Sequence, residues 1–209
     1  MIALDYFYYI LPIFIFANVT AFTPGPNNII LSSTAIEHGF YKTIPQIFGI
    51  FFGFLSMLTI CLFGLGKIFL IYPSLFWLIK ILSSIFLLYL AYKIFNSKNF
   101  TDSNNYKPFT FFQIYFFQII NPKGVMVQIT AASLFIQGTF TYQLEVFLIF
   151  ICFAFSTITS GITWALIGHG LKKFIHDQKK IILFNKVMAI ALVTCIVLII
   201  VWDILVLNI

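Results

Sequence analysis

The sequence predicts an all-α membrane protein in which six transmembrane helices form two inverted three-helix repeats, with helices 1 and 4 broken near mid-membrane. Its 209 residues are 61% hydrophobic and 9% charged, with a mean hydropathy of +1.04. A soluble domain carries about 25% charged residues, so this chain has too few charges to coat a water-facing surface. We expect one polytopic membrane domain over residues 1–209, with repeat one at about 1–97 and repeat two at about 108–209.

Apolar runs long enough to cross a bilayer alternate with short polar or basic turns. An uninterrupted membrane helix needs about 20 residues. The first and fourth runs are longer than this, as expected if each consists of two half-helices joined by a break. The expected spans cover about 6–36, 43–69, 75–95, 108–135, 143–168 and 182–205.

The first run is interrupted by two prolines around a glycine, followed by two asparagines. A proline has no backbone N–H and its ring clashes with the carbonyl one turn earlier, while the residue before it is pushed out of the helical region. The interruption therefore ends one half-helix and starts another. It consists of Thr23-Pro24-Gly25-Pro26-Asn27-Asn28.

The fourth run is interrupted in the same way at Asn121-Pro122, directly before Lys123. Each break falls in the first span of a three-span half. Because three is odd, the two halves are expected to lie in the membrane with opposite orientations. Broken helices at matching positions of inverted halves indicate the binding site of a secondary transporter. Aligning Pro26 with Pro122 places Asn27 opposite Lys123, although residue identity between the halves is slight.

The two breaks have the chemistry of a site for a zwitterion near the bilayer centre. A half-helix that begins inside the membrane exposes unpaired N–H groups and a positive dipole end, which bind carboxylates. The unwound carbonyls around Thr23 to Gly25 and at Asn121 can accept from an ammonium group. We therefore predict a site for an amino acid formed by Thr23, Pro24, Gly25, Pro26, Asn27, Asn28, Asn121, Pro122 and Lys123.

Further polar residues are candidates for the cavity or for coupling. Gln118 and Gln128 flank the second break and Gln46 begins the second span; each can line a cavity or bond another helix. Lys80, in the third span, either snorkels outward or takes a partner. His38 takes part in proton traffic or belongs to a solvated turn.

Acidic residues give no proton carrier at mid-membrane. A carboxylate at that depth would indicate a proton or ion pathway. All six acids fall in loops or toward span ends: Asp5, Glu37, Asp102, Glu145, Asp177 and Asp203. Coupling to H⁺ therefore does not follow from these residues.

The lysines predict the orientation. Cytoplasmic loops carry an excess of basic residues, and one side of the expected topology has nine lysines while the other has Lys67 alone. The odd-numbered loops should be cytoplasmic, with both termini outside. The net charge of +6 is thus a sign of topology and not of nucleic-acid binding. The nine are Lys42, Lys93, Lys98, Lys107, Lys172, Lys173, Lys179, Lys180 and Lys186.

The chain start and the cysteines have simple interpretations. No basic segment precedes the first apolar run, since the first lysine is Lys42, so a cleaved signal peptide is not expected. Cys61, Cys152 and Cys195 each lie in an apolar run without a CxxC pair, as small buried hydrophobes do.

Three other functions stay open. An intramembrane redox protein or enzyme is disfavoured because neither broken run holds a cysteine and no HExxH or GxSxG stands at membrane depth. A metal or other small-metabolite exporter is the nearer alternative, within the transporter class. A metal exporter would need clustered ligands, whereas His38, His169 and His176 are scattered. A structural subunit would not need two broken helices. We predict no metal site, cofactor or nucleic-acid partner, and the Phe-rich faces can meet lipid or a second copy in a homodimer.

Taken together, these motifs resemble the LysE/RhtB family of bacterial amino-acid exporters over nearly the whole chain. The resemblance implies a six-helix inner-membrane protein that exports amino acids or derivatives by proton antiport with alternating access. It also implies binding roles for the TPGPN residues 23–27 and the NPK residues 121–123. One departure is Ser83-Ser84, where the family often has Gly-Ala. Similar stretches are TPGPN at 23–27, GFYKTIPQIFG at 39–49, LIKILSSIFLLYLAYK at 78–93, FFQIINPKGVMVQITAAS at 116–133 and FNKVMAIA at 184–191.

Overall fold

The computed structural model describes residues 2–65 and 108–174, with single residues between 71 and 95 and between 182 and 194. Within these residues all regular structure is helical. Most of the expected spans at 75–95 and 182–205, and the candidate residue Lys80, lie outside the described residues. The elements are α1 (Ile2–Phe22), α2 (Pro26–His38), η1 (Phe40–Thr43), α3 (Ile44–Ile60), η2 (Cys61–Leu65), α6 (Phe111–Ile120), α7 (Pro122–Phe135) and α8 (Tyr142–Phe174).

Two to three of the described segments are long and apolar enough to cross a membrane. Phe40–Gly64 has 25 residues and Tyr142–Leu171 has 30. The helices Tyr6–Phe22 and Pro26–His38 are long and apolar enough to cross a membrane only if they are counted together as one broken span, with a bend of 51° between them. The helix Phe111–Ile120 is apolar but shorter. The helical membrane class is therefore confirmed, while the count of six spans and their inverted repeat stays a prediction.

Large apolar side chains cover the outside of these helices. On α8, Phe147, Ile151 and Phe155 are about half exposed and follow one another at four-residue spacing. Phe112 and Phe116 do the same on α6. Apolar surface of this extent is unusual for a soluble monomer, and it suits contact with lipid chains.

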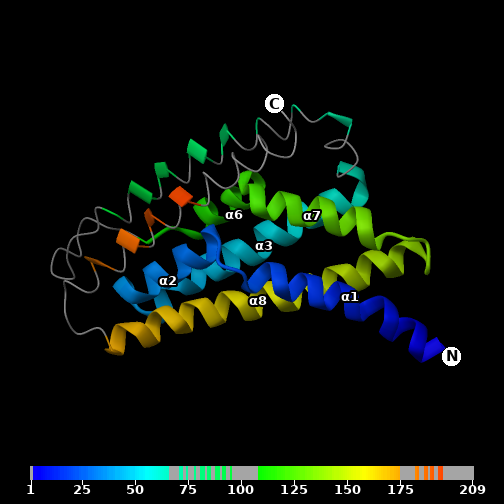
Figure 1. Ribbon diagram of the computed structural model, residues 1–209, viewed down its shortest axis with the longest axis horizontal. Helices are drawn as coiled ribbons and strands as arrows, with labels where there is room; N and C mark the ends of the chain where they lie inside the picture. The colour runs from blue at the N-terminus through cyan, green and yellow to red at the C-terminus, as the bar shows by residue number, and fades with distance from the viewer. Residues whose placement is uncertain are drawn as a thin grey trace.

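Helix α8 runs alongside both α1 and α2 and spans the break between them (Figure 1). A side chain at Gly168 would not fit, because an added Cβ would lie 2.4 Å from the carbonyl oxygen of Ser32. The hydroxyl of Ser32 in turn donates to the carbonyl of Trp164 at 3.1 Å. Small residues permit this close backbone approach, which is a common packing device between membrane helices.

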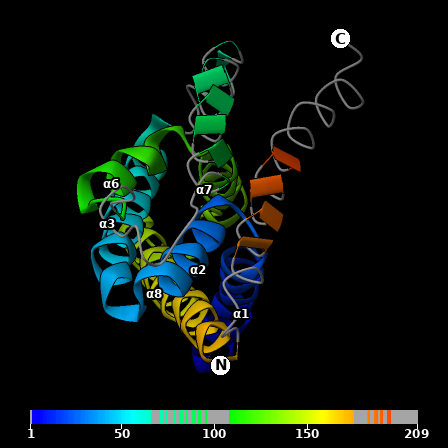
Figure 2. The same ribbon diagram turned by 90° about the vertical axis from the view of Figure 1, so that its left-hand side faces the viewer.

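Helix α3 packs against α6 through a second small-residue contact (Figure 2). Gly49 and Gly53 form a GxxxG spacing on α3. An added Cβ would lie 2.7 Å from the carbonyl oxygen of Phe111 at Gly49 and 2.6 Å from that of Tyr115 at Gly53. Gly49 and Gly53 are therefore the points of close approach between α3 and α6. Gly64, by contrast, has open space around it and a φ of 120°, inside the π-helical turn that follows α3.

The turn between α7 and α8 is organised by a buried carboxylate. Glu145, in the first turn of α8, has no exposed surface. Tyr6 and Tyr9 of α1 pack on the ring of Phe140 in this turn, at centroid distances of 4.7 and 5.2 Å. The turn is therefore fixed to the start of α1. The carboxylate accepts from four consecutive backbone N–H groups, those of Gln137, Gly138, Thr139 and Phe140, at 2.8 to 3.2 Å.

The apolar core has two main parts, and the candidate site lies where they meet. One part joins α2, α3 and α6 and includes Leu31, Ile50 and Phe117. The other joins α1, α3, α7 and α8 and includes Phe54 and Phe153. Between them, the chain breaks interrupt the helical packing, so polar backbone groups come to the centre of the bundle.

Candidate binding site

The first break places backbone carbonyls where side chains from two other segments reach them. Gly25 is extended, with a φ of −171° and a ψ of 178°, as the residue before a proline tends to be. The carbonyl of Ala21 accepts from Asn28 Nδ2 at 2.9 Å and from Ser160 Oγ at 2.8 Å. Asn28 Nδ2 also donates to the Thr23 carbonyl at 2.9 Å. Neighbouring side chains thus satisfy the carbonyls that the break exposes, as a membrane interior requires.

The second break is capped by its own asparagine. Asn121 ends α6 and is the N-cap of α7, and its Oδ1 accepts from the N–H of Gly124 at 3.5 Å. Pro122 follows at the first helical position, where a missing N–H costs no hydrogen bond. Lys123 directly follows this proline, so the local sequence places its cationic side chain in the first turn of α7.

Lys123 reaches from the second break to the first. Its Nζ donates to the carbonyl oxygen and to Oγ1 of Thr23, both at 2.9 Å. The side chain passes over Gly25, where an added Cβ would lie 3.0 Å from Nζ and 3.1 Å from Cδ. The sequence suggested that the carbonyls of the first break bind a substrate ammonium group. In this structure the ammonium group of Lys123 holds that position at Thr23.

The amides of Asn27 and Gln118 form a reciprocal pair between the two breaks. Asn27 Nδ2 donates to Gln118 Oε1 at 2.8 Å, and Gln118 Nε2 donates to Asn27 Oδ1 at 3.0 Å. Gln118 has no exposed surface, and its Nε2 also contacts the carbonyl of Ile114 at 3.1 Å. Each amide therefore fixes the orientation of the other, and the start of α2 is tied to α6.

A cavity opens at the breaks. Its empty volume is about 580 Å³, which includes the open space at its mouth. Among the described lining residues, Lys123 alone carries a charge. The lining residues are Ala17, Thr20, Ala21, Gly25, Pro26, Asn27, Asn28, Leu31, Ile50, Phe54, Asn121, Lys123, Gly124, Val127, Phe153, Thr157, Ser160 and Gly161.

Most of the residues predicted from the breaks meet at this cavity. Thr23 is not among its lining residues but is the hydrogen-bond partner of Lys123. Pro24 is exposed on the connection, and Pro122 is buried behind Lys123. The breaks therefore form one continuous polar region, although the binding role of each residue stays a prediction.

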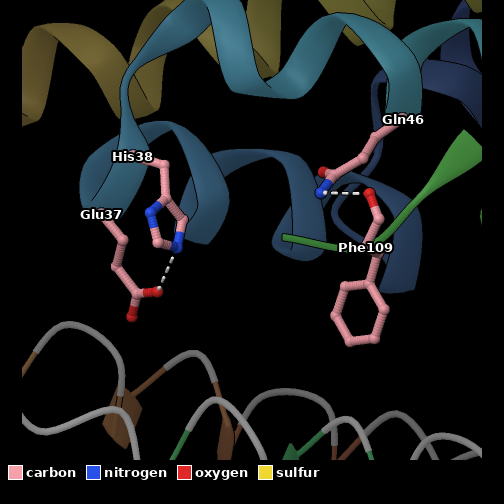
Figure 3. A network of polar contacts seen from close by, with 4 residues as sticks. All are labelled: Glu37, His38, Gln46 and Phe109. Carbon is pink, nitrogen blue, oxygen red and sulfur yellow. Dashed lines mark hydrogen bonds and ion pairs between the residues drawn. The ribbon is translucent and has the colours of Figure 1, made fainter. Parts of the chain in front are cut away.

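Other candidates lie apart from the cavity. Gln46 Nε2 donates to the carbonyl of Phe109 at 3.2 Å, and His38 Nε2 lies 3.6 Å from a carboxylate oxygen of Glu37 (Figure 3). Gln128 Nε2 donates to the carbonyl of Phe54 at 3.1 Å. Gln128 of α7 thus bonds another helix, α3, which is one of the two roles that the sequence allows for it. Gln46 instead bonds the segment that precedes α6.

Sequence reasoning missed the wall that α8 contributes. Phe153, Thr157, Ser160 and Gly161 line the cavity from one face of this helix. Their spacing of four, three and one residues is that of a single helix face. A small polar stripe on an otherwise apolar span could have indicated this wall, but only the tertiary structure brings it to the breaks.

Two helical breaks that meet at one cavity are typical of a membrane transporter. Comparison with known families makes this specific. The LysE type translocator family matches residues 18–201, so the chain belongs to that family, and it is a transporter and not an enzyme.

Relatives with assigned names are similar over most of the chain. A "Cysteine/O-acetylserine efflux protein" of Salmonella typhimurium strain LT2 is 31% identical over 178 residues, which cover 85% of this chain and 90% of the relative. The protein of the same name from Escherichia coli strain K12 is 29% identical over 177 residues, with the same coverage. No solved structure matches the chain.

Proposed function

We propose that this chain exports a small zwitterionic amino acid, or a derivative of one, across the bacterial inner membrane. The observation that carries the proposal is the cavity at the two breaks, whose described lining has Lys123 as its one charged side chain. Relatives of this chain are named as efflux proteins for cysteine and O-acetylserine, which also favours amino-acid export. Both of these substrates are small and carry no net charge.

The charges of the cavity favour a particular substrate class. A carboxylate entering the cavity meets the Lys123 ammonium group and the N-terminal ends of α2 and α7, which attract negative charge. The substrate's ammonium group takes the carbonyl of Thr23 in place of Lys123. A cationic side chain, as in lysine, would bring a second positive charge into the same confined space without a carboxylate partner from the described wall, which is unfavourable. We therefore infer that neutral amino acids are preferred over cationic ones.

Transport in this proposal uses alternating access and proton exchange. Six helices form two inverted repeats around the fixed breaks, with both termini outside the cell. Export of a neutral zwitterion gains nothing from the membrane potential, whereas each proton that enters in exchange adds about 2.3 kcal/mol per 100 mV. His38, paired with Glu37, and Lys80 are the candidates for coupling. A homodimer would cover part of the exposed Phe-rich surface.

Uptake into everted membrane vesicles tests the proposal directly, because their lumen corresponds to the outside of the cell. Vesicles with an acidic lumen are given labelled O-acetylserine, cysteine, serine or lysine. We expect accumulation of at least one neutral amino acid, loss of that accumulation when a protonophore collapses the gradient, and none for lysine. Vesicles without the protein are the control.

The possible failures point to different parts of the proposal. Folded protein that accumulates no amino acid would contradict amino-acid export. Lysine uptake equal to that of the neutral substrates would contradict the charge argument. Accumulation that is the same with and without a pH gradient would contradict proton exchange but not amino-acid export.

A further inference from the structure

One polar side chain of the cavity is not used by the protein itself. Thr157 lines the cavity and is 9% exposed, and its hydroxyl has no hydrogen-bond partner in the part of the chain that the structure describes. Each other polar side chain of the wall makes at least one hydrogen bond: Thr20, Asn27, Asn28, Asn121, Lys123 and Ser160. Thr157 therefore differs from its neighbours.

The hydroxyl also departs from the usual behaviour of threonine in a helix. A helical threonine commonly donates to the carbonyl three or four residues earlier. On the same helix, Thr159 donates to the Phe155 carbonyl at 2.7 Å and Thr163 donates to that of Thr159 at 2.8 Å. The Thr157 oxygen keeps accessible surface, unlike the fully buried and partnerless hydroxyl of the preceding Ser156, so it is open to the cavity that Thr157 lines. The arrangement at Thr157 is understandable if a ligand supplies the partner.

The surroundings of Thr157 show which part of a ligand would reach it. Ser160, one turn later on α8, is tied to the Ala21 carbonyl at the first break. Phe153, one turn earlier, stacks on Phe54 with a centroid distance of 5.7 Å. Thr157 thus stands between the polar breaks and an apolar wall. A substrate whose charged groups lie at the breaks would extend its side chain along α8, past this hydroxyl.

We propose that Thr157 determines specificity by hydrogen-bonding a polar atom in a short substrate side chain, such as a hydroxyl, a thiol or an ester oxygen. The proposal rests on the proposed export function and specifies its substrate class. A hydroxyl is both donor and acceptor, so one residue can serve all three groups. A site built to hydrogen-bond a substrate also rejects the analogue that lacks the bond, because the protein's polar group is then left unpaired.

The test compares two substrates that differ in one group. L-Serine and L-2-aminobutyrate have nearly the same shape, but a methyl group replaces the hydroxyl in the second. Wild-type vesicles should prefer serine. In Thr157→Val, which keeps the shape and removes the hydroxyl, this preference should fall about fivefold, the loss expected for one neutral hydrogen bond. Thr157→Ser should retain it.

Thr163→Val is the matched control. It makes the same change six residues further along α8. There the hydroxyl already bonds its own backbone and does not line the cavity. Its serine preference should equal that of the wild type. Thr157→Ala provides a second hydroxyl-free variant if the valine variant does not reach the membrane.

The other possible outcomes contradict either the role of Thr157 or the export function. If Thr157→Val or Thr157→Ala transports with the wild-type preference for serine, Thr157 does not determine specificity, and the proposed export function is unaffected. Equal loss of both substrates would show a structural role instead, and a wild type without preference would also remove the assignment. If the wild type moves no labelled amino acid, the export function itself falls.

Discussion

The ammonium group of Lys123 donates to the carbonyl and the hydroxyl of Thr23, both at 2.9 Å, although the two residues are 100 positions apart in the chain. This contact links the start of α7 to the end of α1 across both breaks. On the proposed function, a zwitterionic substrate replaces one contact by two: its ammonium group binds Thr23 and its carboxylate binds Lys123. A cation of the protein itself thus joins the two breaks.

Replacing Lys123 by alanine should reduce export by about 10- to 100-fold, because a charged hydrogen bond to the substrate is lost. The initial rate of uptake into everted vesicles measures this, normalised to the amount of protein in the membrane. Lys42→Ala, on the exposed turn η1, removes the same charge outside the cavity and should leave the rate unchanged. Wild-type export by Lys123→Ala would remove this residue from the binding site.

The amide pair of Asn27 and Gln118 should show energetic coupling. Each single alanine variant leaves one amide without its partner, whereas the double variant removes both, so the two losses should not add. We expect a coupling free energy of about 1 kcal/mol in a double-mutant cycle. Thermal unfolding of the purified protein in detergent measures the cycle. Strict additivity would mean that the pair contributes no net stability.

Gly168→Ala should destabilise the protein, by about 1–3 kcal/mol as in other overpacked contacts. The added Cβ would lie 2.4 Å from the Ser32 carbonyl oxygen and force α2 away from α8. Gly170→Ala is the control on the same helix, because nothing lies within 4 Å of its added Cβ. Its unfolding temperature should stay the same or rise slightly, since alanine is the better helix former. A stable Gly168→Ala protein would show that α2 and α8 can separate without loss.

Glu145→Gln should loosen the turn between α7 and α8. A carboxylate offers acceptors to all four N–H groups, whereas the amide end of glutamine turns a donor toward some of them. Because the group is fully buried, we expect a loss of about 3 kcal/mol. The exposed neighbour Gln143→Ala serves as the control. Equal unfolding temperatures for the two variants would contradict the structural role of the carboxylate.

Local chemistry made the breaks predictable. The helix ends at Phe22 and Ile120 and the restarts at Pro26 and Pro122 follow from prolines, which lack an N–H wherever the rest of the chain lies. The apolar spans, and the position of Lys123 at the start of a half-helix, are also predictable from the local sequence. The motifs around these breaks were also specific enough to indicate the family.

Partners across the bundle were not predictable in the same way. The sequence offered Gln118, Gln128 and Gln46 as equal candidates, and their identical side chains carry no sign of which one meets a break. In the structure Gln118 bonds Asn27, while Gln46 and Gln128 bond backbone carbonyls of other segments.

The sequence by itself therefore determined the membrane class, the breaks and the cation at the second break. The tertiary structure decided that Lys123 binds Thr23 and that α8 brings Thr157 to the cavity. The physical reason is range: a proline acts on its own turn of helix, whereas a hydrogen bond between helices depends on packing such as that at Gly49 and Gly168, which sets how closely the backbones approach.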